Sequence, residues 1–318
     1  MTPDWGLADM PDQSGRTVVI TGANSGLGYA ATEAFARRGA DVVMACRSVE
    51  RGREAAEGIR LGTGDGSLTV MELDLANLDS VRTFADAFGT EFDALHVLCN
   101  NAGVMATPRR ETADGFELQF GVNHLGHFAL TGRLLEDLRA TDGESRVVTH
   151  SSAIHERGDI DFDDLHSETA YDKWDAYAQS KLANALFGFE LDRRLSAAGA
   201  SVTSVVCHPG YADTNLQRRG PEMAGSRLRL LGMRAVNLVF GQSATQGALP
   251  LLYAATASDI EGGEYVGPGG LLNMRGSPER QEPSTRARDE ALADRLWAVS
   301  EELTGFSYDV PSVATRQD

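Results

Sequence analysis

The chain contains almost no lysine. Of its 29 basic residues, only Lys173 and Lys181 are lysine, and the others are arginine. With 46 acidic residues the formal net charge is −17, and no basic run offsets it, which argues against nucleic acid as a partner. Two explanations of this composition stay open. One is adaptation to a salt-rich cytoplasm, where screening weakens the repulsion between carboxylates; the other is codon usage that favours arginine.

Other features of secreted and membrane proteins are also missing. The three cysteines, Cys46, Cys99 and Cys207, are far apart in the sequence, which excludes a disulfide framework and favours a reducing compartment. Residues 1–16 are acidic and lack the apolar segment of a signal peptide. No apolar run approaches the roughly 18 residues that a membrane span requires. We therefore expect a cytoplasmic protein without a membrane span.

Short β-rich runs alternate with segments of helical spacing, a pattern that favours right-handed βαβ units. It predicts an α/β fold: a Rossmann-like, doubly wound parallel sheet of about seven strands with helices on both faces. We expect one domain over 1–318, with a dinucleotide-binding and catalytic core, a substrate lid, a last helix and strand, and a C-terminal helix and tail (15–215, 211–240, 241–285 and 286–318). Strands are expected at 17–20, 41–46, 67–75, 96–103, 145–152 and 200–210, and helices at 27–40, 49–61, 78–89, 116–140, 175–198 and 286–305.

A glycine-rich turn, TGANSGLG (21–28), follows the first expected strand. The spacing of Gly22, Gly26 and Gly28 differs from the G-x-G-x-x-G fingerprint, but the physical requirement is similar. Backbone without Cβ atoms can approach a pyrophosphate, and the N-terminus of the next helix offers free N–H groups to the anion. The loop predicts a nucleotide site, and a tight turn without a ligand is the alternative.

The residues after the second and third strands bear on the choice of cofactor. In place of a carboxylate that would bind a ribose hydroxyl, the second strand ends in Cys46 and is followed by Arg47. A guanidinium suits a 2′-phosphate, so NADP(H) is expected rather than NAD(H), and a solvated surface arginine in an arginine-rich chain is the alternative. Asp74 and Leu75 are expected to border the adenine, and an aspartate that caps its own strand is the alternative.

One of the two lysines stands four residues after a tyrosine. Tyr177 and Lys181 lie one turn apart on an expected helix, and a nearby ammonium lowers the pKa of a phenol. Ser151 and Ser152 end the fifth expected strand, at the sheet edge where ligands bind in open α/β folds. A tyrosine that donates a proton and a serine that orients a carbonyl would together support its reduction.

The motifs TGANSGLG (21–28), NNAG (100–103), SS (151–152), YAQSK (177–181) and HPGYADT (208–214) occur in the order typical of the short-chain dehydrogenase/reductase family. The chain resembles this family over roughly residues 15–270. The resemblance implies that Tyr177 is the general acid or base, that Lys181 lowers its pKa and binds the nicotinamide ribose, that Ser152 rather than Ser151 orients the carbonyl, and that Asn123 holds a relay water. The implied cofactor residues are Gly22, Asn24, Ser25, Gly26, Leu27, Gly28, Arg47, Asp74, Leu75, Asn101, Ala102, Gly103, Tyr177, Lys181, Pro209, Gly210 and Thr214, with no metal.

The segment AIHERGDIDFDDLHSETAYDKWD (153–175) makes the gap between Ser152 and Tyr177 longer than in compact members. It resembles the retinol-dehydrogenase-like branch, whose substrates are lipophilic aldehydes, ketones and alcohols. Without the membrane anchor of many such enzymes, the chain is expected to be a soluble prokaryotic member, haloarchaeal in type if the salt explanation holds. Its carboxylates alternate with Ile160 and Phe162, as on a solvated strand, which we favour over a metal site.

Two alternatives to a carbonyl reductase or alcohol dehydrogenase stay open. Protochlorophyllide reductases share the glycine loop and the Tyr/Lys pair, so reduction of a C=C bond is one. A regulator that binds NADP(H) without turnover is the other, although such proteins commonly lose the tyrosine or the lysine. The helices expected at 116–140 and 175–198 are where family members form dimer contacts, so a homodimer or homotetramer is expected.

Overall fold

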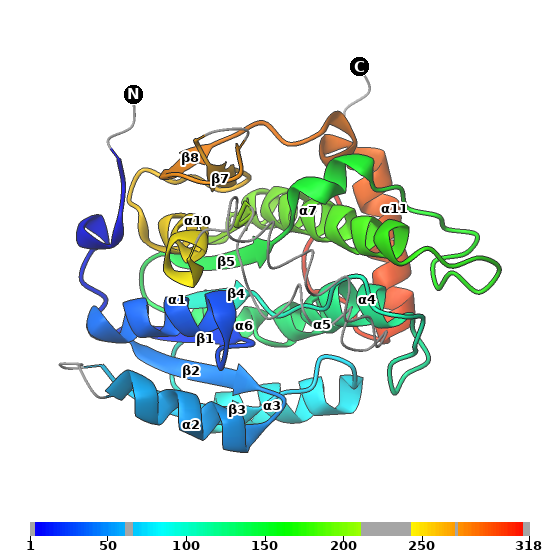
Figure 1. The fold of residues 1–318 in the computed structure, drawn as a ribbon. Coiled ribbons are helices and arrows are strands. Elements are labelled where there is room, and N and C mark those ends of the chain that lie inside the picture. Colours follow the sequence, from blue (N-terminus) through cyan, green and yellow to red (C-terminus); the bar gives the residue numbers. More distant parts are fainter. Residues whose placement is uncertain (1–3, 61–65, 211–242, 271–272, 314–318) are drawn as a thin grey trace, which may run out of the picture.

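The computed structural model describes residues 4–60, 66–210, 243–270 and 273–313. Eight strands form one sheet in the order β3-β2-β1-β4-β5-β6-β7-β8, and helices cover both of its faces (Figure 1). The strands are β1 Thr17–Thr21, β2 Asp41–Cys46, β3 Leu68–Glu72, β4 Val97–Asn100, β5 Ser145–His150, β6 Val202–Cys207, β7 Tyr265–Pro268 and β8 Pro278–Arg280. The longer helices are α1 Gly26–Arg37, α2 Val49–Arg60, α3 Leu78–Glu91, α5 Gly126–Arg133, α7 Lys173–Ala197, α10 Ala244–Thr256 and α11 Glu290–Thr304.

The first seven strands are parallel, as the alternation of strands and helices predicts, and the doubly wound α/β fold is confirmed. The expectation of about seven strands misses one. β8 pairs with β7 in the antiparallel direction at the edge of the sheet. It has three residues and begins with Pro278, so it is too short to show a period in the sequence, and its edge position tolerates proline.

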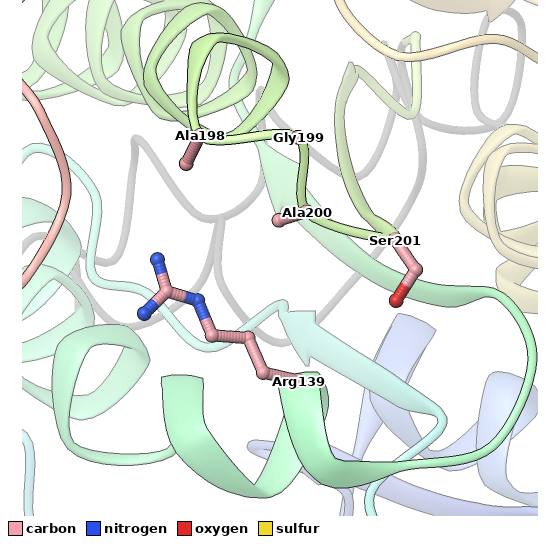
Figure 2. Close-up of a pocket in the computed structure, with 5 residues that line it drawn as sticks. All are labelled: Arg139, Ala198, Gly199, Ala200 and Ser201. Carbon is pink, nitrogen blue, oxygen red and sulfur yellow. The ribbon is translucent and has the colours of Figure 1, made fainter.

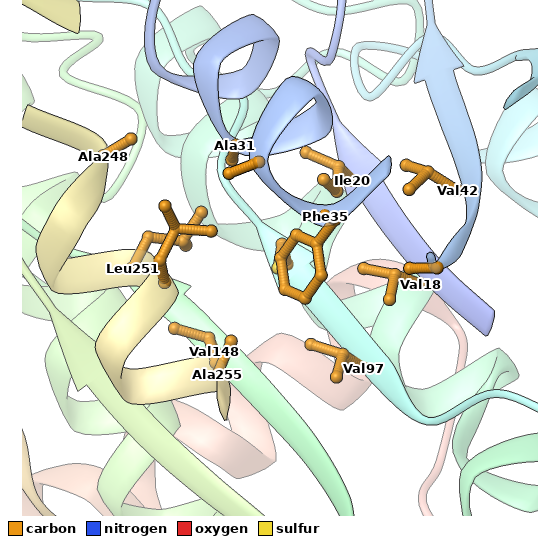
Figure 3. Packing of buried hydrophobic residues seen from close by; sticks show 14 of the residues in the cluster. Val18, Ile20, Ala31, Phe35, Val42, Val97, Val148, Ala248, Leu251 and Ala255 are labelled. Carbon is orange, nitrogen blue, oxygen red and sulfur yellow. The ribbon is translucent and has the colours of Figure 1, made fainter. Parts of the chain in front are cut away.

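Two apolar layers fix the sheet between its helices. Val18 and Ile20 of β1 face α1, α2 and α10, whereas Val19 faces α3, α5 and α7. Figure 3 shows Phe35 of α1 and Leu251 of α10 packed over the first of these faces. Side chains alternate between the two faces along a strand, so a sheet that is buried on both faces requires central strands that are apolar at every position. Packing on both faces holds the carboxyl ends of these strands in one row.

The long helix expected at 116–140 is interrupted. A short helical turn, α4 Leu118–Phe120, leads into a π-helical turn, η2 Gly121–Leu125, and then into α5 and α6, Leu135–Ala140. A π turn inserts one residue into the helical spacing and so changes which residues share a face. The apolar spacing of the sequence did not reveal this break, which contains Asn123.

The insert before α7 contains no strand, contrary to the expectation. It begins with a 3-10 helix, η3 Ala153–Arg157, and continues as turns in which Ile160 is buried and Phe162 is half-buried. The carboxylates of Asp161 and Asp164 accept hydrogen bonds from backbone N–H groups of these turns. Among the described residues, no group of three acidic, histidine or cysteine side chains could hold a metal ion.

The tail helix α11 lies along α7 and also contacts α5 (Figure 1). Its predicted apolar side is confirmed: Leu296 and Trp297 are buried, and Leu292 and Leu303 are partly buried. Ser300 adds a 2.8 Å hydrogen bond to the His124 ring. This packing places part of the same chain on the two helices at which subunit contacts are expected. None of the helices in the described ranges is long and apolar enough to cross a bilayer.

Candidate active site

Each glycine of the motif TGANSGLG (21–28), which joins β1 to the start of α1, is required for its own physical reason. Gly22 and Gly26 have positive φ angles of 68° and 58°, in the left-handed region that glycine tolerates best. A Cβ on Gly28 would lie 2.6 Å from the Asn101 amide nitrogen and would also collide with the Gly22 carbonyl. The N-cap of α1, Ser25, makes no side-chain cap hydrogen bond, so the first N–H groups of the helix remain available to an anion. The loop therefore fits a dinucleotide pyrophosphate.

The turn after β4 is tied to this loop. The hydroxyl of Thr21 accepts hydrogen bonds of 2.9 Å from the backbone N–H groups of Asn101 and Ala102, and the Asn101 amide donates to the Thr21 carbonyl at 2.7 Å. A Cβ on Gly103 would lie 3.1 Å from the Asn123 amide oxygen and 3.8 Å from the Lys181 ammonium. The expected cofactor residues 101–103 thus lie between the glycine loop and the expected catalytic residues.

Arg47 lies beside the glycine loop. β1 and β2 are in register as far as Thr21 and Ala45, so Arg47, two residues further along, is level with the start of the loop, and its side chain is exposed. At the end of β3, the Asp74 carboxylate accepts the N–H of Ala76 at 3.0 Å, which is the capping role weighed as the alternative. Leu75 is buried and its carbonyl is closely approached by α5 at Gly126.

Tyr177 and Ser152 come together from α7 and from the end of β5. Tyr177 is only 6% exposed, and the side chain of Ser152 lies close enough to its phenol to lower the pKa of that group. The neighbouring Ser151 is buried, and its hydroxyl donates to the Lys181 backbone carbonyl at 2.7 Å. Ser151 therefore anchors β5 to α7, and Ser152 is the serine whose hydroxyl faces the phenol.

Lys181 occupies the next turn of α7. Its ammonium lies 5.9 Å from the centre of the Tyr177 ring and donates to the His150 carbonyl at 3.0 Å. A second α7 side chain, the amide of Asn184, donates to the same carbonyl at 2.8 Å. These two bonds fix the end of β5, and with it Ser151 and Ser152, against the helix that carries Tyr177.

The pKa values differ from the expectation. Burial raises the pKa of Tyr177 to about 12, and the side chain of Ser152 opposes the rise. Burial also lowers the pKa of Lys181 to about 8. The physical reason is burial, because desolvation penalises the charged forms of both groups. The phenol is therefore protonated at neutral pH, as a proton donor must be.

Asn123, in the π-helical turn, is completely buried. Its amide oxygen accepts the Val104 N–H at 2.8 Å, and its amide nitrogen donates to the Val104 carbonyl and to the Ser180 hydroxyl, both at 2.9 Å. The side chain thus joins the segment after residues 101–103 to α7. Its backbone carbonyl lies 3.0 Å from Nδ1 of His127.

Beyond β6, Pro209 and Gly210 are described, and Gly210 needs its freedom because its φ is +66°. Thr214 and the expected lid at 211–240 lie outside the described residues. His208, just before Pro209, is buried and stacks on Tyr265 with 5.3 Å between ring centres.

Histidines are the site residues that the sequence prediction missed. His127 bridges Asn123 and the Thr21 hydroxyl, the latter at 2.9 Å, and Nδ1 of His150 lies 3.1 Å from the Asn101 amide oxygen. Burial lowers the pKa of His127 to about 4 and that of His150 to about 3, so both rings are neutral. His127 connects two groups, whereas Nε2 of His150 is buried without a hydrogen-bond partner among the described residues. For two of the buried histidines, position was the signal available in the sequence. His150 ends the apolar strand β5, and His208 directly follows the apolar strand β6.

A separate hollow lies far from this constellation. Arg139 at the end of α6 faces the turn 198–201 between α7 and β6 across it (Figure 2). Ser201 leads into β6 and its carbonyl accepts the N–H of Ser145 at the start of β5, so this is the amino-terminal edge of the sheet. Arg139 is itself bonded to Glu136 and to the Asp309 carbonyl. The catalytic candidates lie at the opposite, carboxyl-terminal edge.

Comparison with known proteins agrees with this geometry. The short chain dehydrogenase family model matches residues 16–224. Polyprenol dehydrogenase of Mus musculus is 46% identical over 93% of this chain and 86% of its own, and retinol dehydrogenase 12 of Homo sapiens is 43% identical over 93% and 88%. A crystal structure of an uncharacterized protein from Mycobacterium paratuberculosis has a TM-score of 0.79 and 43% identity, covering 96% of this chain and 99% of that one. A haloarchaeal or other prokaryotic origin stays a prediction. The chain belongs to the short-chain dehydrogenase/reductase family of oxidoreductases and has retinol-dehydrogenase-like relatives.

Proposed function

We propose that this chain is an NADP(H)-dependent oxidoreductase that interconverts a lipophilic aldehyde or ketone and the corresponding alcohol. The observation that carries the proposal is the pairing of Tyr177 with Ser152 at the carboxyl edge of the sheet, beside the ammonium of Lys181 and the glycine loop. A bound nicotinamide dinucleotide supplies or accepts the hydride. No metal is needed for this chemistry.

The proton chemistry belongs to the chain's own residues. For reduction, Ser152 orients the substrate oxygen and the neutral phenol of Tyr177 donates the proton to it. For oxidation the phenol must first lose its proton, which its raised pKa opposes. Lys181 has three N–H donors, of which one is directed to the His150 carbonyl, and the others are suited to the hydroxyls of a ribose. Asn123 holds the segment at Val104 in place beside them.

The preference for lipophilic substrates has two supports. Trp174, one turn before Tyr177 on α7, is 46% exposed, and its ring contacts the Tyr177 ring edge-on at 6.4 Å. An exposed indole beside the proton donor favours an apolar substrate that covers it. Two of the relatives named above are dehydrogenases of polyprenol and of retinol, both lipophilic alcohols. The preference for NADP(H) rests on Arg47, placed beside the glycine loop.

The test is NADPH oxidation with a panel of aldehydes and ketones, and NADP⁺ reduction with the alcohols, for wild type and Tyr177→Phe. We expect turnover by wild type and a loss of about 100-fold or more in the variant, because the proton donor is removed and the ring is kept. NADPH binding, followed by fluorescence, should be equal in both. Binding without turnover of any substrate would favour a regulator, and turnover of α,β-unsaturated substrates only at the C=C bond would favour a C=C reductase.

A further inference from the structure

His155 lies directly beneath the proposed catalytic serine. It belongs to η3, the 3-10 turn that begins after Ser152, and is only 1% exposed. Its Nδ1 lies 2.7 Å from the Ser152 carbonyl oxygen, and its backbone N–H donates to the same oxygen at 2.9 Å. On the other side of the ring, Nε2 lies 3.3 Å from the backbone nitrogen of Ser284.

These two contacts assign the tautomer. A carbonyl oxygen only accepts hydrogen bonds, so Nδ1 of His155 must carry a proton. A backbone amide only donates, so Nε2 must present its lone pair to Ser284. The ring is therefore neutral and connects Ser152 to Ser284, and its Nδ1 also lies 3.5 Å from the Tyr265 hydroxyl. Burial lowers the pKa of His155 and keeps the ring in this form.

The segment 281–284, which includes Ser284, also contacts a second histidine of the site, His208. Gln281 accepts from Nε2 of His208 at 2.8 Å, while Nδ1 of His208 accepts the N–H of Gly210 at 3.3 Å. His208 thus has the opposite tautomer. Residues 281–284 consequently support both the turn at Ser152 and the segment after β6, and Tyr265 separates the two imidazoles with ring contacts to each.

We propose that His155 is a positioning residue for Ser152, which it serves by holding the Ser152 carbonyl and so fixing the direction in which the serine hydroxyl faces Tyr177. This inference rests on the proposed function, because it assigns His155 an effect on the reaction through Ser152. The Ser152 hydroxyl itself accepts the N–H of Ile154 at 3.4 Å within the same turn, so a change in the turn moves the hydroxyl. A displacement of about 1 Å at a reacting group can cost up to 100-fold in rate.

Two conservative variants separate the two ends of the ring. The amide of His155→Asn places a donor where Nδ1 stands and loses the contact with Ser284. The longer amide of His155→Gln reaches Ser284 and leaves the Ser152 carbonyl with the backbone N–H of residue 155 but without the side-chain donor. We expect kcat to fall about tenfold in His155→Gln and less than about threefold in His155→Asn, with KM for NADPH unchanged in both. Equal losses in the two variants would overturn the proposal.

A double-variant cycle distinguishes positioning from general stability. If His155 acts through the Ser152 hydroxyl, His155→Gln should cause no further loss of kcat in a Ser152→Ala background. Multiplicative losses would mean that His155 acts elsewhere. His96→Gln is the matched control: His96 accepts the Thr17 N–H at 3.0 Å at the amino-terminal edge of the sheet, and its substitution should leave kcat within about twofold.

Hydrogen exchange provides a readout without turnover. The N–H groups of Ile154 and His155 should exchange faster in His155→Gln than in His155→Asn, measured on a peptide spanning 150–158 at equal melting temperature. Unchanged hydrogen-exchange rates in both variants would contradict the positioning role of His155, even if activity falls. If Ser152→Ala retains wild-type activity, Ser152 is not needed for the proposed reaction. The exchange data would still show whether His155 holds the turn at Ser152.

Discussion

The ammonium of Lys181 donates to the backbone carbonyl of His150 while it faces the ring of Tyr177 from 5.9 Å. One side chain thus connects α7, which carries the proposed proton donor, to β5, which ends at His150 just before Ser151 and Ser152. It does so in a chain from which lysine has been almost eliminated. An ammonium is compact and can direct three N–H bonds to different partners, whereas a guanidinium is flat and larger.

Lys181→Arg should therefore lose most activity although it keeps a positive charge. The flat group cannot both donate to the His150 carbonyl within this buried site and serve a ribose, so we expect kcat/KM to fall about 100-fold. Steady-state kinetics with NADPH gives the value, and Lys173→Arg, at the first residue of α7, is the matched control. Near-wild-type turnover of Lys181→Arg would remove Lys181 from the mechanism.

Arg47→Asp should shift the preference from NADP(H) towards NAD(H). A carboxylate repels the 2′-phosphate and can accept a bond from the 2′-hydroxyl, so the ratio of kcat/KM for the two cofactors should change by about tenfold or more. The same charge change at Arg82, which lies on α3 and pairs with Asp79, should leave the ratio unaltered. An unchanged ratio in Arg47→Asp would show that Arg47 does not contact the phosphate.

Trp174→Ala should affect large apolar substrates selectively. If the exposed indole covers part of a lipophilic substrate, its removal should raise KM for such substrates about tenfold and leave small aldehydes unaffected. Leu7→Ala removes another exposed apolar side chain, in the N-terminal segment, and should change neither KM. A uniform loss on all substrates would instead assign Trp174 to the support of Tyr177.

Acid should destabilise the fold through buried histidines. Burial lowers the pKa of His124 and His150 to about 3 and that of His127 and His208 to about 4, against 6.5 for an exposed ring. As pH falls below 6.5, only the unfolded chain takes up these protons, so stability falls until the folded pKa values are reached, by about 1.4 kcal/mol per pH unit for each histidine. Urea unfolding of wild type and of His150→Gln between pH 6 and 4.5 measures how the free energy of unfolding changes with pH. Its decrease per pH unit should be smaller in the variant by one such contribution, and an equal decrease would contradict burial of His150 as the cause.

The features that the sequence predicts well are those fixed by local pattern. The strands around Val18 and Val97 are apolar runs between helical periods, and the glycine loop requires glycine for reasons of backbone geometry. The sequence did not predict the edge strand at Pro278 or the π turn at Asn123, because each is too short to show a periodic pattern of apolar residues. Both depend on tertiary contacts rather than on local propensity.

The electrostatics of the site were the hardest part to foresee. Spacing places Tyr177 and Lys181 on one helical face, but it does not tell which atom of the phenol the ammonium approaches or how deeply both are buried. Burial decides the pKa values here, and burial is a property of the whole fold. The same holds for His150 and His155, whose roles follow from neighbours far away in the sequence, such as Asn101 and Ser284.

The position of α11 has a consequence for how the protein behaves at low concentration. Every residue of α7 from Ala176 to Leu191 is buried within one chain, and α11 supplies part of that cover through Leu296 and Trp297. The support of Tyr177 and Lys181 is thus covalently attached and cannot dissociate when the protein is diluted. The part of this cover that α11 provides is therefore independent of protein concentration, whether or not subunits associate.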